Sequence, residues 1–166
     1  MTPEAPRGGT IAVQVVIPGQ PQGKGRPKVV KIASFTRMAT PAKTVAYECL
    51  VAHAAALALA GAQPFECAVR VDMHLWCQEP KSLTKRERAA IADGTKRPTT
   101  KPDIDNVVKA IFDGFNGVLW RDDVQVVDLH VSKHYTANAP RVVVNVQPFV
   151  VPTEERVQAD LLGEAA

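Results

Sequence analysis

The stretch DIDNVVKAIFDGFNG, residues 103–117, carries the clearest structural pattern in the chain. Apolar residues recur in it at intervals of three and four, which places them along one stripe of a helix. They are Ile104, Val107, Val108, Ile111, Phe112 and Phe115. Asn116 and Gly117 together form a typical helix stop. The stretch therefore predicts a helix over residues 103–116 that packs its apolar stripe against the rest of the fold.

Apolar and polar residues alternate in other parts of the chain, and this period of two is typical of strands buried on one face. The alternating segments are residues 10–18, 67–77, 124–135 and 141–149. The last two are predicted to form a hairpin around residues 138–140.

Two further helices are predicted between these strands. Thr40 is the expected N-cap and Pro41 the first helical position of a long, Ala-rich helix that Gly61 ends. Residues 82–93 are expected to form a short helix closed by Gly94, and residues 19–37 a loop or irregular hairpin. The element order indicates an α+β fold, with a small mixed or mostly antiparallel sheet packed with two main helices.

The chain of 166 residues has the length of a single domain with short tails. We assign residues 1–9 to an N-terminal extension, 10–149 to the domain and 150–166 to an acidic C-terminal tail. Hydrophobic residues make up 46% of the chain, which is too many for an intrinsically disordered protein.

The sequence does not indicate a membrane or an export route. It has no run of about 18 apolar residues. Its first ten residues contain Pro, Glu and Gly where a signal peptide needs an apolar stretch. Cys49, Cys67 and Cys77 fit no metal-binding spacing, and we expect them to be buried free thiols. A cytoplasmic protein without a membrane partner is predicted.

The charge is strongly segregated along the chain, although the net value is only +3. Residues 5–47 hold seven basic side chains and no acidic one, and residues 79–102 hold seven basic against three acidic ones. In residues 103–128 the sign reverses, with six aspartates against Lys109 and Arg121. This pattern excludes an evenly charged surface and indicates a polyanion partner beside a separate carboxylate-rich site.

The aspartates lie where a helix and a strand begin. Asp103 and Asp105 belong to the first turn of the predicted helix, and Asp122-Asp123 precedes the next strand. We expect Asp103, Asp105 and one of the paired aspartates to come together. Converging carboxylates need a cation, and a site of oxygen ligands alone favours Mg²⁺ or Mn²⁺ over zinc. Such a site supports attack of water on a phosphodiester.

Each of these features also has a structural interpretation. An aspartate at a helix start is often a cap, and Lys109, four residues after Asp105, is placed for a surface salt bridge as well as for a scissile phosphate. Paired aspartates before a strand often form a turn. The basic segments are either solvated loops or phosphate contacts. Their candidate DNA-binding residues are Lys24, Arg26, Lys28, Lys96, Arg97 and Lys101.

The segment KPDIDNVVKAIFDGFNGVLWRDDVQVVD, residues 101–128, resembles the core signature of the RusA family of Holliday-junction resolvases. Its matching parts are P-D-x-D-N-x-x-K-x-x-x-D and, further on, W-x-D-D-x-Q. IPGQPQGKGRPKVV and TPAKTVAYE, upstream, are similar to the basic N-terminal region of longer phage- and prophage-type members. KSLTKRERAAIADGTKRPTTKPD resembles the insertion of those members before the motif. The resemblance covers residues 10–149.

The resemblance implies a small α+β fold and a homodimeric, Mg²⁺-dependent endonuclease, with Mn²⁺ as an alternative metal. Its substrate would be a four-way DNA junction, nicked on two opposed strands during recombination and repair. Asp103, Asp105 and Asp123 would be the essential carboxylates and metal ligands, with Asp122 as a further ligand. Lys109 would be the basic residue of the active site and Asn106 a supporting residue.

Two other functions compete with this one. A protein that holds branched DNA without cutting it would share the basic segments, but it gains nothing from carboxylates that repel phosphate. A metal-dependent phosphotransferase acting on small substrates would be expected to carry a Gly-rich phosphate loop, and GQPQGKGRP is not a P-loop. The sequence thus favours the nuclease.

Overall fold

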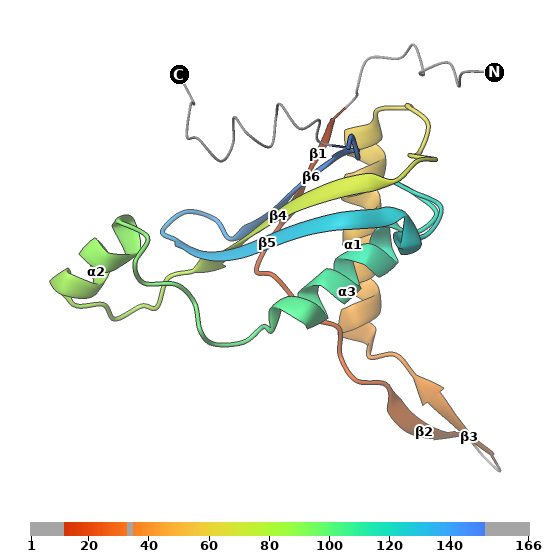
Figure 1. Ribbon diagram of the computed structural model, residues 1–166. Coiled ribbons are helices and arrows are strands. Elements are labelled where there is room, and N and C mark those ends of the chain that lie inside the picture. Colours follow the sequence, from red (N-terminus) through yellow and green to blue (C-terminus); the bar gives the residue numbers. More distant parts are fainter. Residues whose placement is uncertain (1–11, 33–34, 152–166) are drawn as a thin grey trace.

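The computed structural model describes residues 12–32 and 35–151 (Figure 1). In chain order its elements are β1 (Val13–Pro18), β2 (Lys28–Ile32), β3 (Phe35–Ala39), α1 (Ala42–Leu59), β4 (Val69–Gln78), α2 (Lys85–Ala92), α3 (Ile104–Phe115), the 3-10 turn η1 (Asp123–Gln125), β5 (Val126–Thr136) and β6 (Arg141–Pro148). The α+β prediction with a mixed sheet is confirmed.

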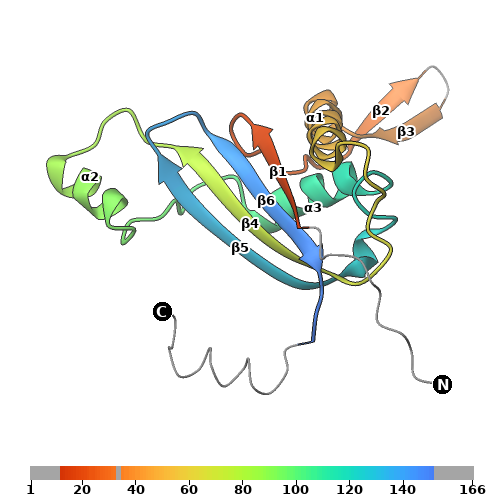
Figure 2. The same ribbon diagram turned by 90° about the horizontal axis from the view of Figure 1, so that it is seen from above.

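The main sheet has four strands in the order β1-β6-β4-β5. β4 is antiparallel to β6 and parallel to β5, and β1 is antiparallel to β6. Every second residue of β1, β4 and β6 is buried, so one face of the sheet forms the core and the other is more open. Helices α1 and α3 contribute to the same buried cluster and therefore cover that face (Figures 1 and 2).

The core is closed by aromatic residues at the end of α3. Trp120 is fully buried and lies edge-on to Phe112 and Phe115, with ring centroids 5.3 Å apart in each pair. Its indole nitrogen donates to the Asn116 side-chain oxygen at 2.7 Å, which satisfies the polar end of a buried tryptophan. The predicted stop at Asn116-Gly117 is confirmed, because α3 ends at Phe115 and Gly117 has a φ of +74°.

The predicted hairpin of the last two strands is wrong. β5 and β6 do not pair with each other, because β4 lies between them and pairs with both. β4 alternates between buried and half-buried residues from Val69 to Cys77, as suits a central strand. The connection from β5 to β6 therefore crosses the end of β4. Alternation reports which face of a strand is buried, but it does not report which strands are neighbours.

The long helix starts one residue later than predicted, and two cysteines are more exposed than predicted. Pro41, not Thr40, is the N-cap, with an extended backbone and no capping side chain. Cys49 and Cys67 are exposed, and Cys77 is buried. Cys49 lies on the outer side of α1, and Cys67 precedes the first residue of β4, so neither reaches the core.

By length and hydropathy alone, α1 would meet the requirement for a membrane span. Its buried residues Tyr47, Val51 and Ala55 belong to the core cluster that also holds strand and α3 residues. A core helix satisfies the same requirement, so this property of α1 does not indicate a membrane protein.

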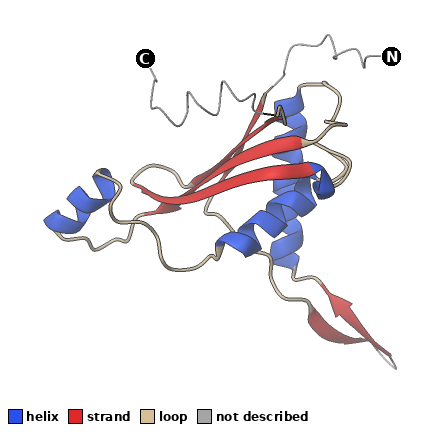
Figure 3. Cartoon of the chain, in the orientation of Figure 1, coloured by secondary structure: helices blue, strands red, loops and turns tan. Residues whose placement is uncertain are grey.

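Two elements project from this body. The hairpin β2–β3 forms its own two-stranded sheet, and α2 has no buried residue. They lie at opposite ends of the molecule, with the start of α3 between them (Figures 1 and 3). α2 agrees with the predicted short helix: Thr84 and Glu87 form a capping box at its start, and Gly94, with a φ of +78°, follows its end.

Candidate active site at the start of helix α3

Asp103 and Asp105 stand at the start of α3 as predicted. Asp103 is the N-cap residue, with extended backbone angles, but its side chain makes no capping hydrogen bond. Asp105 lies in the first turn, and its side chain is 65% exposed. The capping interpretation of Asp103 is therefore not supported, and both carboxylates are accessible to a ligand.

A cavity of about 410 Å³ opens beside Asp103. Its lining residues are Gln20, Gly23, Lys24, Lys101, Pro102, Asp103 and Asn106. The loop after β1 forms one wall, because the Lys24 amide donates to the Asn106 carbonyl at 2.8 Å. A Cβ on Gly23 would lie 3.0 Å from the Asn106 Cβ, so glycine permits this close approach. The structure thus brings together four of the predicted residues: Lys24, Lys101, Asp103 and Asn106.

Asp103 and Asp105 form a first acidic group at the helix start, and Asp113, Asp122 and Asp123 form a second one further along the helix. Burial raises the pKa of Asp123, and the nearby carboxylates of Asp122 and Asp113 raise it further. Asp113 follows Asp105 by eight residues, which is about 12 Å along a helix axis. Asp123 therefore sits within electrostatic range of the C-terminal half of α3. Within residues 12–32 and 35–151, no three His, Cys, Asp or Glu side chains form a group able to hold a metal ion by themselves. The expected three-carboxylate group of Asp103, Asp105 and one of the paired aspartates is therefore not formed in this structure.

Lys24 pairs with carboxylates of the protein itself. Its ammonium group donates to Asp113 and lies 3.8 Å from Glu48 Oε1 on α1. The hydrogen bond to Asp113 and the charge of both carboxylates raise the pKa of Lys24, against a smaller opposing effect of burial. Lys24 thus remains charged and connects the loop after β1 to both helices, a role that its sequence context did not indicate.

Lys109 forms an ion pair with Asp105 one helical turn away. Its Nζ lies 3.8 Å from the Asp105 carboxylate, and both side chains are 65% exposed. An exposed pair of this kind contributes little to stability, so the ammonium group is free to turn toward a bound phosphate. The salt bridge considered from the sequence is present, and it does not exclude the catalytic role.

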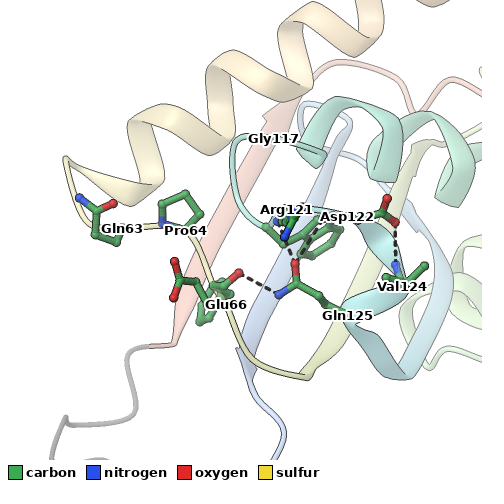
Figure 4. A pocket seen from close by; sticks show the side chains of 10 residues that line it. Gln63, Pro64, Glu66, Gly117, Arg121, Asp122, Val124 and Gln125 are labelled. Carbon is green, nitrogen blue, oxygen red and sulfur yellow. Dashed lines mark hydrogen bonds between the residues drawn. The ribbon is translucent and has the colours of Figure 1, made fainter.

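The Asp122-Asp123 turn is fixed by Gln125. The Gln125 side chain accepts from the Arg121 amide at 2.9 Å and donates to the Phe65 carbonyl at 2.8 Å. Asp122 accepts from the Val124 amide at 3.1 Å and caps η1. Figure 4 shows these contacts at the wall of a cavity of about 1030 Å³ between the Asp122 turn and the segment around Pro64. Asp122 therefore has a structural role in the turn, and Asp123, which is half-buried, lies beside it.

Lys133 is a residue that the sequence did not single out. From β5 it donates to the Thr100 carbonyl at 2.7 Å and to the Pro102 carbonyl at 2.9 Å. These bonds hold the chain immediately before Asp103 against the sheet. Hydrogen bonds from a charged donor are among the stronger ones in proteins, so Lys133 is a positioning residue for the start of α3.

The remaining predicted DNA-binding residues fall into two groups. Lys96 donates to Glu87 at 2.6 Å, and Arg97 contacts the His134 ring and the Gly94 carbonyl, so both are engaged within the protein. Arg26 and Lys28 are exposed and carry no ion pair to another described residue.

Comparison with known proteins identifies the family of this chain. Residues 18–147 match the family model of endodeoxyribonuclease RusA. The chain belongs to the RusA family. It is also 34% identical over 142 residues to the uncharacterized protein YqaN of Bacillus subtilis (strain 168), a match that covers 81% of this chain and 95% of YqaN. The family resemblance drawn from the motif is confirmed.

RusA-family membership defines the general activity of this chain, which is an endodeoxyribonuclease and therefore a hydrolase of DNA phosphodiesters. The matched range contains both acidic groups, the Lys24 loop and Lys133. Branched DNA is the partner that the family implies.

Proposed function

We propose that this RusA-family chain is a Mg²⁺-dependent, structure-selective endonuclease that resolves four-way DNA junctions by paired nicks. The observation that carries the proposal is the uncapped Asp103 carboxylate, which lines an open cavity together with Lys101 and Asn106. A helix start with two accessible carboxylates would hold a hard cation, and the lysine beside it attracts the phosphate that the cation would share.

The donor set fits Mg²⁺ in its chemistry. Mg²⁺ is commonly held by one or two carboxylates together with water and substrate phosphates, so a complete protein cage is not required. Asp103 and Asp105 would supply these carboxylates. When bound, the metal supplies an activated water and stabilises the leaving oxygen. Mn²⁺ accepts the same oxygen ligands.

Other side chains have supporting roles in the proposal. Lys109 would neutralise charge on the scissile phosphate, since it is free to leave its exposed pair with Asp105. Asp123, whose raised pKa reflects burial and the neighbouring carboxylates, would act from the second acidic group. Asn106 would fix the cavity wall through its bond to the Lys24 amide.

A homodimer would supply two equivalent sites related by two-fold symmetry, as paired cuts on opposed strands require. We place the protein in the cytoplasm, because its cysteines Cys49, Cys67 and Cys77 are free and two of them are exposed, which suits a reducing compartment. Sedimentation of the purified protein, expected at twice the 17.9 kDa chain mass, tests the dimer.

The decisive experiment uses a synthetic four-way junction with each strand labelled in turn. The wild type is expected to make symmetric nicks with Mg²⁺ and none with EDTA. Asp105→Asn and Asp123→Asn should each lower nicking by at least about a hundredfold, since metal-assisted charge stabilisation is worth several kcal/mol. Junction binding in Ca²⁺ should persist, because neither change removes a positive charge.

Asp128→Asn is the matched control. The substitution is of the same type and lies in the same acidic stretch. The Asp128 carboxylate, however, lies on the sheet, 3.6 Å from Arg70 and 3.5 Å from His130. The Asp128→Asn variant should nick the junction at the wild-type rate. Equal nicking of linear duplex and junction would contradict junction selectivity. Tight binding without nicking in both Mg²⁺ and Mn²⁺ would instead identify a protein that holds branched DNA.

A further inference from the structure

The hairpin β2–β3 is unusually isolated. Its strands pair with each other and with no other strand in the described part of the chain. Val29, Phe35 and Met38 are 65%, 60% and 62% exposed. A lone two-stranded hairpin is marginally stable in water, and large apolar side chains at its surface are typical of a contact with a partner.

The register of the hairpin mixes apolar and cationic residues on each face. On one face Val29 lies opposite Met38, and Lys31 lies opposite Thr36. On the other face Val30 lies opposite Arg37. A protein core would not take up these cations, whereas a nucleic acid offers phosphates to them and base faces to the apolar side chains.

Charge identifies the kind of partner. Lys28, Lys31 and Arg37 are exposed, and no acidic residue occurs between residues 5 and 47. No described carboxylate forms an ion pair with any of the three. A two-fold contact between the hairpins of two copies would set these cations against themselves. A polyanion is therefore the partner that the hairpin fits.

The root of the hairpin is fixed beside the candidate active site. The Gly25 amide donates to the Thr44 hydroxyl at 3.0 Å, and the Lys24 amide donates to the Asn106 carbonyl at 2.8 Å. A Cβ on Gly25 would lie 2.9 Å from the Thr44 hydroxyl oxygen, so the chain is tightly held where it leaves the body. The root of the hairpin therefore lies next to the cavity that Gly23, Lys24 and Asp103 line, and the hairpin projects from there away from the body. Figure 1 shows this projection.

We propose that the β2–β3 hairpin is an arm that engages the branch point of DNA. Its cations Lys28, Lys31 and Arg37 contact phosphates, while Phe35 and Met38, on opposite faces of the hairpin, each pack on base faces that are exposed where strands separate. Proteins insert apolar side chains between bases in this way when they bend or open DNA. The inference rests on the proposed function, and it adds a structural element that distinguishes branched from linear DNA.

Two hairpin variants test the proposal. The apolar variant is Phe35→Ser/Met38→Ser, and the charge variant is Lys28→Gln/Lys31→Gln/Arg37→Gln. Affinities for a four-way junction and a linear duplex of equal length are measured in Ca²⁺ over a range of salt. The apolar variant should lose about tenfold in junction affinity and little in duplex affinity, as expected for lost stacking. The charge variant should weaken both and reduce the salt slope by about 3.

Leu57→Ser/Val127→Ser is the matched control, because it removes two exposed apolar side chains elsewhere, 67% and 56% exposed. It should bind both DNAs like the wild type. Junction affinity of the apolar variant equal to that of the wild type would overturn the proposal. The proposal would also be overturned if the apolar variant sedimented at a lower mass than the wild type, because the hairpin would then be a contact between copies.

The two proposals fail in different ways. If the wild type neither prefers the junction nor nicks it, the proposed function fails. The affinity of the charge variant for linear duplex then still tests whether the hairpin contacts DNA. If the wild type nicks the junction and both hairpin variants bind it unchanged, only the arm is overturned.

Discussion

The body and the two projections of this molecule are built on different physical principles. The body, made of the four-stranded sheet with α1, α3 and η1, holds the fully buried residues, among them Trp120, Phe115 and Ile17. In the hairpin β2–β3 every described side chain except Ala39 is exposed, and α2 has no buried residue. Apolar burial stabilises the body, whereas local pairs and caps stabilise the projections.

The body and the projections therefore have different tasks. The body holds the acidic groups on α3 and η1 in fixed positions. The projections lie on both sides of the start of α3 (Figure 1), and their sequences carry exposed cations such as Lys31 and Arg86. Substitutions in the body are expected to change the free energy of unfolding or the placement of Asp103. Substitutions in the projections are expected to leave global stability unchanged.

The largest effect is expected at Gly114, where α1 and α3 touch. A Cβ there would lie 2.7 Å from the Val51 Cβ and 2.8 Å from the Glu48 carbonyl oxygen. Gly114→Val should therefore lower the free energy of unfolding by about 3 kcal/mol, the upper range for overpacking. Urea denaturation measures it. Met38→Ala on the hairpin is the contrast and should change stability by less than about 0.5 kcal/mol.

A variant Gly114→Val with wild-type stability would contradict a closely packed helix pair. A large loss in Met38→Ala would contradict the separation of body and projections, because it would mean that the hairpin contributes to the common core.

An intermediate effect is expected at Lys133, which joins the body to the segment that leads from α2 into α3. Lys133→Met removes two hydrogen bonds to the Thr100 and Pro102 carbonyls. The Mg²⁺ concentration for half-maximal nicking should rise about tenfold, as for other residues that orient metal ligands. Lys133→Arg can still donate both bonds and should restore most of the activity. If Lys133→Met needs the same Mg²⁺ concentration as the wild type for half-maximal nicking, Asp103 is positioned without Lys133.

The smallest effect concerns α2 and pH. The hydrogen bond from Lys96, followed by bonds from Thr84, lowers the pKa of Glu87 to about 2 from its usual value of 4.5. Since the folded pKa is the lower one, the stabilisation is complete above about pH 4.5 and is lost as the pH falls toward 2. The protection of the α2 amides, taken as the ratio of the intrinsic to the observed exchange rate at each pH, should fall over that window, and Glu87→Gln should remove most of this pH dependence. An equal loss of protection in β4 would mean that α2 opens only with the body.

The sequence predicted the features that repeat or stop locally. The apolar stripe predicted α3, and Gly94 predicted the end of the short helix α2. The position of Asp103 at the start of α3 followed from the same stripe. Such signals depend on residues a few positions apart, so one chain suffices to detect them.

Long-range features could not be predicted in this way. Lys133 contacts carbonyl groups, and any residue can supply a carbonyl, so no side-chain pattern near position 101 indicates it. The placement of β4 between β5 and β6 depends on the crossover between β4 and β5, which alternation does not encode. The pairing of Lys24 with Asp113, 89 positions apart, likewise needs the folded chain.

The parallel pair β4–β5 has a consequence for how such a chain can change. Every residue between Gln78 and Val126, including α2 and α3, belongs to one connection between two adjacent strands whose register is continuous from Arg70 to Gln78. The strands act as fixed end points, and the entropic cost of a longer connection rises only slowly with its length. Because α2 has no buried residue, it can therefore be lengthened, shortened or exchanged while the strands on either side of the connection keep their register.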